Sequence, residues 1–121
     1  MMDKIQALHN FWSNFGLTAY DQNTVPDDAQ LPYITYEVSD DSFGNTLAQT
    51  ASLWYRSSSW ADITNKEIQI SNFITMGGRL VTYNDGAFWI KKASPWAQRM
   101  SDPSDDKIRR IVLNVTIEFL D

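Results

Sequence analysis

A run with alternating hydrophobicity, Thr46 to Arg56, stands just before an amphipathic segment at residues 60–76. A period of two predicts a strand, whereas apolar residues spaced three and four positions apart predict a helix. The apolar side of the run contains Leu47, Ala51, Leu53 and Tyr55. The expected packed side of the helix contains Trp60, Ile63, Glu67, Ile70, Phe73 and Ile74. This pair of elements is devoted to packing and carries no chemistry of its own.

The ends of this helix have recognisable signals. Ser59 is the expected N-cap, and Asp62 stands three residues later, where its carboxylate can return a hydrogen bond to the cap. Gly77 and Gly78 close the helix because glycine suits the conformation that follows a helix end.

An N-terminal helix precedes these elements. Asp3 stands before a stripe with helical spacing that contains Ile5, Leu8, Phe11, Trp12 and Phe15. Gly16 is expected to stop the helix. Residues 17–31 then contain the turn signals Pro26, Asp27 and Asp28, and we read them either as a loop across a sheet edge or as a short strand around Ala19 and Tyr20.

Four further segments read as strands. Residues 33–39 alternate, and Asn84-Asp85-Gly86 joins residues 79–83 and 87–92 in a tight hairpin. Residues 93–106 contain two prolines and are expected to form a polar loop. The last strand places one apolar face, Ile111, Leu113, Val115, Ile117 and Phe119, opposite Arg110, Asn114, Thr116 and Glu118.

The order of these segments predicts an α+β fold: an antiparallel β-sheet of four to five strands with two α-helices packed on one face, as a two-layer sandwich. A length of 121 residues fits one domain, residues 1–121, with a single core.

Charge and composition narrow the classes of function. The formal net charge is -5, which opposes a grip on nucleic acid because phosphate binding needs clustered Lys and Arg. The chain has no cysteine, hence no disulfide framework and no thiolate zinc site. It has no signal-peptide core and no apolar run of the ~18 residues that a membrane span needs. We therefore expect a protein kept in the cytoplasm and without a membrane partner.

Residues that could carry chemistry do not form a catalytic pattern. The acidic doublets Asp27-Asp28, Asp40-Asp41 and Asp105-Asp106 lack the spacing of a calcium loop and read as solvated turns. His9 has no identifiable nucleophile and is expected to be partly exposed. Residues 57–59 are serines without the flanking glycines of a nucleophile elbow. We expect no catalytic residue, no metal site and no cofactor.

Exposed aromatic and basic residues are the better candidates for contact with a partner. Tyr33, Trp54, Trp89 and Trp96 fall on outward strand positions or in loops, where they mark either a contact surface or a second layer covered by loops. The basic residues Lys91, Lys92, Arg99, Lys107, Arg109 and Arg110 form either a solvated strand end or an ion-pair surface that meets acidic doublets of a neighbouring copy. The candidate contact residues are Trp54, Trp89, Trp96, Arg99, Asp105, Asp106, Lys107, Arg109 and Arg110.

Several segments carry a resemblance to a known family. They are residues 31–36 (LPYITY), 42–45 (SFGN), 53–60 (LWYRSSSW), 77–78 (GG), 87–91 (AFWIK) and 101–106 (SDPSDD). In this order they resemble the small tail-completion and tail-terminator (minor tail) proteins of long-tailed phages and prophages of Gram-positive bacteria. The resemblance covers nearly the whole chain and includes no active-site motif.

The resemblance implies a structural protein of the virion that acts at the head-tail joining end of the tail. Such proteins assemble as a ring, typically a hexamer, which stops polymerisation of the tail tube and meets the head connector. The partners implied are further copies of this chain, the tail-tube protein and head-tail connector proteins, with DNA passing through the lumen without specific binding.

Two alternatives remain open at this point. One is another head-tail connector or minor capsid component, which gene order would separate from a terminator. The other is a small enzyme or ligand-binding domain with a cleft beside Trp89 and Trp96 and with Asp102 or Asp105 as acid or base.

Overall fold

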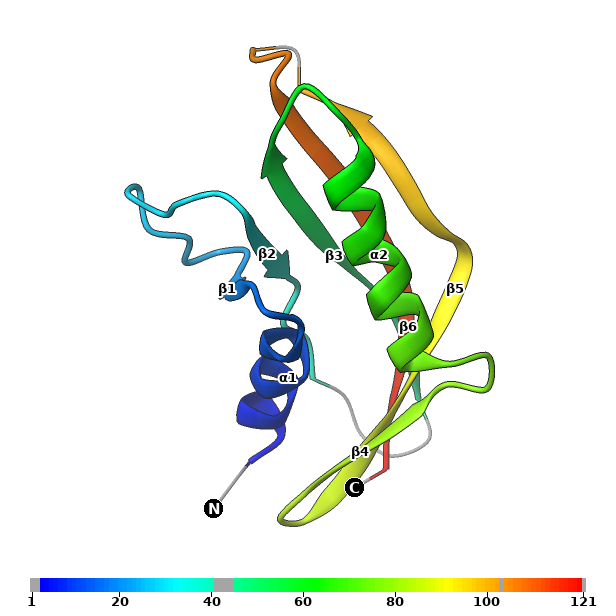
Figure 1. Cartoon of the computed structure of the whole chain (residues 1–121). Helices are drawn as coiled ribbons and strands as arrows, with labels where there is room; N and C mark the ends of the chain where they lie inside the picture. The colour runs from blue at the N-terminus through cyan, green and yellow to red at the C-terminus, as the bar shows by residue number, and fades with distance from the viewer. Residues whose placement is uncertain (1–2, 41–44, 103, 121) are drawn as a thin grey trace.

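The structure, a computed structural model, describes residues 3–40, 45–102 and 104–120 (Figure 1). Its elements in chain order are α1 (Lys4–Trp12), a 3₁₀ turn (Ser13–Phe15), β1 (Thr18–Asp21), β2 (Tyr33–Tyr36), β3 (Thr46–Arg56), α2 (Ala61–Ile74), β4 (Arg79–Tyr83), β5 (Gly86–Ser101) and β6 (Ile108–Phe119). The strands form one six-stranded sheet in the order β1-β2-β3-β6-β5-β4.

The sheet is mixed and curled, so the expected antiparallel sheet of four to five strands in a two-layer sandwich is wrong. β1 pairs with β2 in parallel, and the other neighbours are antiparallel. α1 contacts both edge strands, β1 and β4, although they stand at opposite ends of the strand order. The sheet therefore curls into a half-barrel, with α1 in its open side and α2 across β3, β5 and β6 (Figure 1).

The centre of the half-barrel is the long antiparallel pair β3 and β6, whose register runs from Thr46 opposite Glu118 to Arg56 opposite Ile108. Alternate residues of each strand point to the inner face, as the period of two predicts. The predicted apolar face of β6 is confirmed, with Ile111, Leu113, Val115, Ile117 and Phe119 all buried. The inner face of the sheet and both helices thus share one core.

The fifth strand departs most from expectation. The segment 93–106, expected as a loop, continues β5 as far as Ser101. The ladder with β6 is interrupted between Lys92 and Ala97, and Pro95 lies in this bulge. A proline is tolerated there because the bulge asks for no ladder hydrogen bond from its nitrogen. The Asn114 side-chain amide ties the bulge to β6 by donating to the Pro95 carbonyl at 3.0 Å.

The first helix supplies aromatic side chains to the core. Asp3 caps α1, because its carboxylate accepts from the Gln6 N–H at 2.8 Å, and Gly16 ends the segment at φ 78°. Phe11 makes edge contacts with other rings of the core, at 4.9 Å from Trp12 and 6.5 Å from Phe88. Ile5, expected on the packed stripe, is 44% exposed, because the buried side of α1 is centred on its aromatic residues.

The second helix begins and ends differently from expectation. Its N-cap position is Trp60, and the Ser59 hydroxyl accepts from the Ala61 N–H at 3.0 Å. The Ser59 N–H donates to the Ser57 hydroxyl, so the expected return bond from Asp62 is not formed. α2 ends at Ile74, before the expected Met76. No helix within the described ranges is long and apolar enough to cross a membrane.

The hairpin between β4 and β5 is confirmed. Tyr83 pairs with Gly86, so the turn consists of Asn84 and Asp85, and Gly86, expected in the turn, begins β5. At the other side of the sheet, β1 confirms the short-strand alternative for residues around Ala19 and Tyr20. β2 ends at Tyr36, three residues earlier than expected.

Candidate partner-binding surface

The end of the sheet at which β5 turns into β6 brings together most of the predicted contact residues. Arg99 comes from β5, Arg109 and Arg110 from β6, and Trp54 from the neighbouring end of β3. Asp105, Asp106 and Lys107 form the turn between the strands. We call this region the β5–β6 end; its three parts are the outer face, the inner face and the turn.

On the outer face, an aromatic row crosses the strands. Trp54 stands opposite Tyr33 in the β2–β3 ladder and opposite Arg110 in the β3–β6 ladder. The Arg110 guanidinium lies 4.5 Å from the centre of the Trp54 ring, and the Tyr33 ring lies 6.4 Å away on the other side. Tyr20 extends the row by an edge contact with Tyr33 at 5.5 Å.

Hydrogen bonds fix the orientation of this row. The Trp54 indole N–H donates to the Thr35 hydroxyl at 3.0 Å, and Arg110 Nε donates to the Ser52 hydroxyl at 3.1 Å. Since Thr35 and Ser52 are themselves buried, the two side chains are held by the sheet itself. A stacked and bonded guanidinium loses little freedom when a partner covers it, which favours binding.

A shallow hollow adjoins the row. Its volume is about 170 Å³, and it is lined by Trp54, Ser101, Asp102 and Arg110. A hollow of this size suits one side chain of a partner rather than a whole cofactor, since ligand pockets usually start at roughly 300 Å³. It offers an indole face, a guanidinium and a carboxylate to that side chain.

On the inner face, two arginines share one indole. The guanidinium carbons of Arg99 and Arg109 lie 4.8 Å and 5.3 Å from the centre of the Trp60 ring. Arg99 also donates to the Thr64 hydroxyl at 3.4 Å, and Arg109 donates to the Asp106 carbonyl at 2.6 Å. Trp60, expected only to pack against the sheet, therefore also holds two positive charges at the start of α2.

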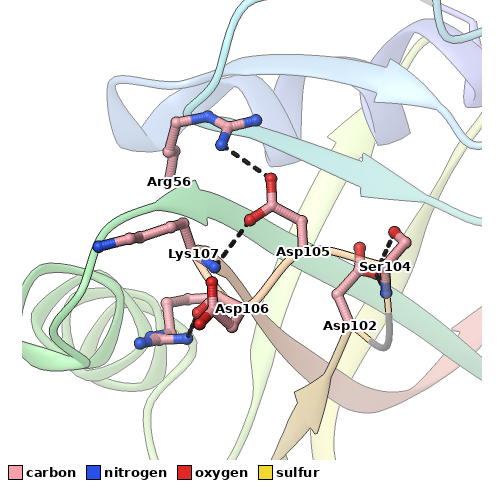
Figure 2. Close-up of polar contacts among 7 residues, drawn as sticks. Arg56, Asp102, Ser104, Asp105, Asp106 and Lys107 are labelled. Atoms are coloured by element: carbon pink, nitrogen blue, oxygen red, sulfur yellow. Dashed lines mark hydrogen bonds and ion pairs between the residues drawn. The ribbon is translucent and has the colours of Figure 1, made fainter.

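The turn is stabilised by its acidic residues (Figure 2). Asp105 pairs with Arg56 at 2.9 Å, and its other oxygen accepts from the Lys107 N–H at 2.9 Å. The Lys107 N–H and, next, Arg56 lower the pKa of Asp105. The pKa of Asp102 is lowered because its carboxylate accepts from the hydroxyl and N–H of Ser104. Asp102 and Asp105 thus stabilise the turn through hydrogen bonds, and Asp105 also forms an ion pair with Arg56, which was not among the predicted contact residues.

Trp89 and Trp96 lie outside the β5–β6 end. Trp89 points to the outer face and donates to the Gly77 carbonyl at 3.1 Å. Trp96 lies in β5 rather than in a loop, and it packs against the core with Lys92 at 6.0 Å from its ring. The two rings therefore do not line a common cleft, and the hollow beside Asp102 is bordered by Trp54 instead.

A second hollow lies where α1 meets β4. It has a volume of about 280 Å³ and is lined by Ala7, Asn10, Phe11, Asn14, Phe73, Arg79, Val81 and Thr82. Arg79 is already engaged there, with its guanidinium 3.8 Å from the Phe73 ring and donating to the Phe73 carbonyl. This hollow lies between α1, α2 and β4, and it is separate from the β5–β6 end.

His9 has partners that the sequence reasoning missed. Its Nε2 lies 3.3 Å from the Ser13 hydroxyl, and its Nδ1 lies 2.9 Å from the Tyr36 hydroxyl. The spacing of four residues on one helix was the available signal for the first contact. Neither His9 nor Ser13 borders the two hollows described above, and His9 is half-buried, as expected. The contact between His9 and Tyr36 joins α1 to β2.

The remaining acidic residues are dispersed. Asp40 forms an ion pair with Lys4 at 2.6 Å, whereas Asp41 lies outside the described residues. Asp27 and Asp28 are exposed in the loop between β1 and β2. Within residues 3–40, 45–102 and 104–120, no three His, Cys, Asp or Glu side chains are placed to hold a metal ion together.

Comparisons of the chain with protein-family models, with curated proteins and with solved structures find no match. What the β5–β6 end offers chemically is contact: flat aromatic area, guanidinium groups held in place, and carboxylates that brace the turn.

Proposed function

We propose that this protein is a structural component of a phage or prophage tail, acting at the head-tail joining end as a tail-terminator or tail-completion protein. Its copies form a ring, which by the family resemblance has six members. The ring binds the tail-tube protein on one side and head-tail connector proteins on the other. It is assembled in the cytoplasm of the bacterial host and remains in the virion.

The observation that carries this proposal is the aromatic row of the outer face with Arg110 stacked on Trp54. Aromatic residues and arginine are enriched where proteins bind one another, and side chains fixed before binding lose little entropy. Figure 1 shows no helix on this face of the sheet within the described residues. The row is thus available to another protein, as a virion component requires.

The net charge supports the same role. At -5 the chain repels the phosphate backbone, which suits a ring through which DNA must slide without being held. Four basic residues, Arg99, Lys107, Arg109 and Arg110, lie at the β5–β6 end, and in this proposal they contact a protein partner rather than DNA.

The test is size-exclusion chromatography coupled to light scattering, over a concentration series. The protein is measured alone and then mixed with the tail-tube protein of the same phage or prophage. We expect a closed species of about six copies in at least one of the two runs, and co-elution with the tail-tube protein in the second. A matched variant, Trp54→Ala with Arg110→Ala, keeps the core intact and should weaken co-elution.

A chain that remains monomeric at every concentration, alone and in the mixture, would overturn the proposal. Assembly that occurs only with a portal-proximal connector protein, and not with the tail-tube protein, would reassign it to another part of the neck.

A further inference from the structure

The fifth strand has a free edge. β4 pairs with β5 only from Gly86 to Ile90, whereas β5 extends to Ser101. Beyond the bulge, residues 97–101 pair with β6 on one side, and no described strand pairs with them on the other. A regular, unpaired edge of this kind is open to association with another chain.

This edge carries a positive charge that is held in position. Arg99 is exposed, and its guanidinium is placed by the Trp60 ring at 4.8 Å and by the Thr64 hydroxyl at 3.4 Å. Among the described residues, no carboxylate forms an ion pair with it. Met100 follows on the opposite face and is 42% exposed. The edge thus combines an uncompensated arginine with apolar surface.

The opposite side of the molecule carries the complementary charge. The loop between β1 and β2 exposes Asp27 and Asp28 on a turn in which the Ala29 N–H donates to the Pro26 carbonyl at 3.1 Å. Neither carboxylate has an ion-pair partner among the described residues. β1 is the first strand in the sheet order, and Figure 1 shows this loop and the C-terminal half of β5 on opposite sides of the half-barrel.

We propose that the open edge of β5 receives the β1–β2 loop of a second copy of this chain, with Arg99 pairing with Asp27 and Asp28. The inference rests on the proposed function, because it names the surfaces by which the ring closes. The two patches differ and lie on opposite sides of one copy, so each copy contacts two neighbours head to tail. Repetition of such a contact closes into a ring when the rotation between copies fits.

The choice of a second copy over an unrelated partner follows from this pairing of charges. Both patches occur on every copy, so each finds its complement at equal concentration. Opposite charges across an interface set its register, and like charges placed there oppose association. The loop and the edge are exposed, so substitutions in them leave the core unchanged.

Charge reversal with light scattering tests the pairing. Arg99→Glu alone, and Asp27→Lys with Asp28→Lys alone, should each raise the concentration at half-assembly about tenfold or more, since each places like charges at every junction. An equimolar mixture of the two variants should assemble near the wild-type concentration. In a ring in which the two variants alternate, every junction joins opposite charges. Half of the junctions pair Glu at position 99 with Lys at positions 27 and 28, and the other half keep the native pairing of Arg99 with Asp27 and Asp28.

Controls reverse charges away from the two patches: Lys91→Glu on the outer face and Asp85→Lys in the β4–β5 turn, both exposed. They should assemble as the wild type does. If the wild type assembles and the two patch variants do so equally well, the pairing is wrong and the proposed function stands. Weakened variants whose mixture is not rescued also overturn the pairing. A wild type that never assembles overturns both proposals.

Discussion

Replacing Gly78 by alanine should destabilise the fold far more than the same change at Gly77. Gly78 has φ +91°, a conformation that residues with a Cβ adopt only at a cost of roughly 1–2 kcal/mol. A Cβ at this position would also stand 2.6 Å from Lys91 Cγ and 2.8 Å from the Ile90 carbonyl oxygen, and would press on the Trp89 indole nitrogen. At Gly77 nothing lies within 4 Å of the added Cβ.

The magnitude follows from the two contributions. The Lys91 and Trp89 side chains can move aside, but the Ile90 carbonyl belongs to β5 and can move only with the strand. Overpacking of this kind costs about 1–3 kcal/mol. Together with the φ cost, Gly78→Ala should lower the free energy of unfolding by about 2–4 kcal/mol, or the Tm by about 10 °C. Gly77→Ala should stay within about 0.5 kcal/mol of the wild type.

Urea unfolding followed by tryptophan fluorescence measures both variants and also reports on Trp89, whose indole bonds to the Gly77 carbonyl. A red shift of the native emission in Gly78→Ala would show that this ring has been displaced. Equal unfolding midpoints for the two alanine variants would refute the reasoning from backbone conformation and steric contact.

Three further predictions concern the β5–β6 end and the end of α2. Arg110→Ala should lower the free energy of unfolding by about 1 kcal/mol through loss of the contact with Trp54, and Arg110→Lys should recover only part of it; urea titration would contradict this if lysine were equivalent to arginine. Because the folded-state pKa of Asp105 is lowered, its carboxylate stabilises the fold above the unfolded-state pKa of about 3.9, and this stabilisation is lost as the pH falls through the folded-state pKa. The stability difference between wild type and Asp105→Asn should therefore shrink from pH 7 to pH 2, and a constant difference would count against the ion pair and turn bond. Thr75, with φ 72° and ψ 170°, adopts a conformation normally left to glycine, so Thr75→Gly should raise the Tm despite the loss of the hydroxyl bond to the Gly78 carbonyl; a lowered Tm would show that this bond outweighs the backbone cost.

Local patterns in the sequence predicted the local structure well. The bounds of β3 and the buried face of β6 are confirmed, because a period of two has few alternative structures. The hairpin after residues 79–83 is also confirmed, although Gly86, expected in its turn, is the first residue of β5. The helix predicted after Asp3 is also confirmed, and the Asp3 carboxylate caps it with a hydrogen bond that closes within one turn of helix.

Some local predictions also failed, such as the bond from Asp62 and the end of α2 at Met76, but the larger errors concern features that depend on distant parts of the chain. Pro95 suggested a loop, but the bulge opposite β6 accommodates it, and nothing near Pro95 in the sequence announces that bulge. The four-residue β1 is stabilised by pairing with β2, from which residues 22–32 separate it in the chain. Local propensity alone therefore left open whether this segment is a loop or a short strand. The curl of the sheet follows from α1 touching both edge strands, which no local pattern encodes.

Some residues of the candidate surface were named from the sequence, but their arrangement was not predicted. Trp54 was named from its outward strand position and Arg110 as one of a group of basic residues, yet their stacking depends on the register between β3 and β6. Trp60 was predicted only as a packing residue, because the two arginines that contact its ring lie in strands far along the chain. Trp96 was predicted as an exposed contact residue because residues 93–106 were expected to form a loop, whereas it lies in β5 and packs against the core.

The central position of β6 also orders events during synthesis. β6 stands between β3 and β5 in the sheet but follows both in the chain, so these two long strands have no partner between them until β6 has been made. Until then the nascent chain presents two long unpaired edges, which are prone to association with other chains. The pairs within β1-β2-β3 and within β4-β5 do not need β6, but the joining of these two parts, and with it the surface at the β5–β6 end, has to wait for β6.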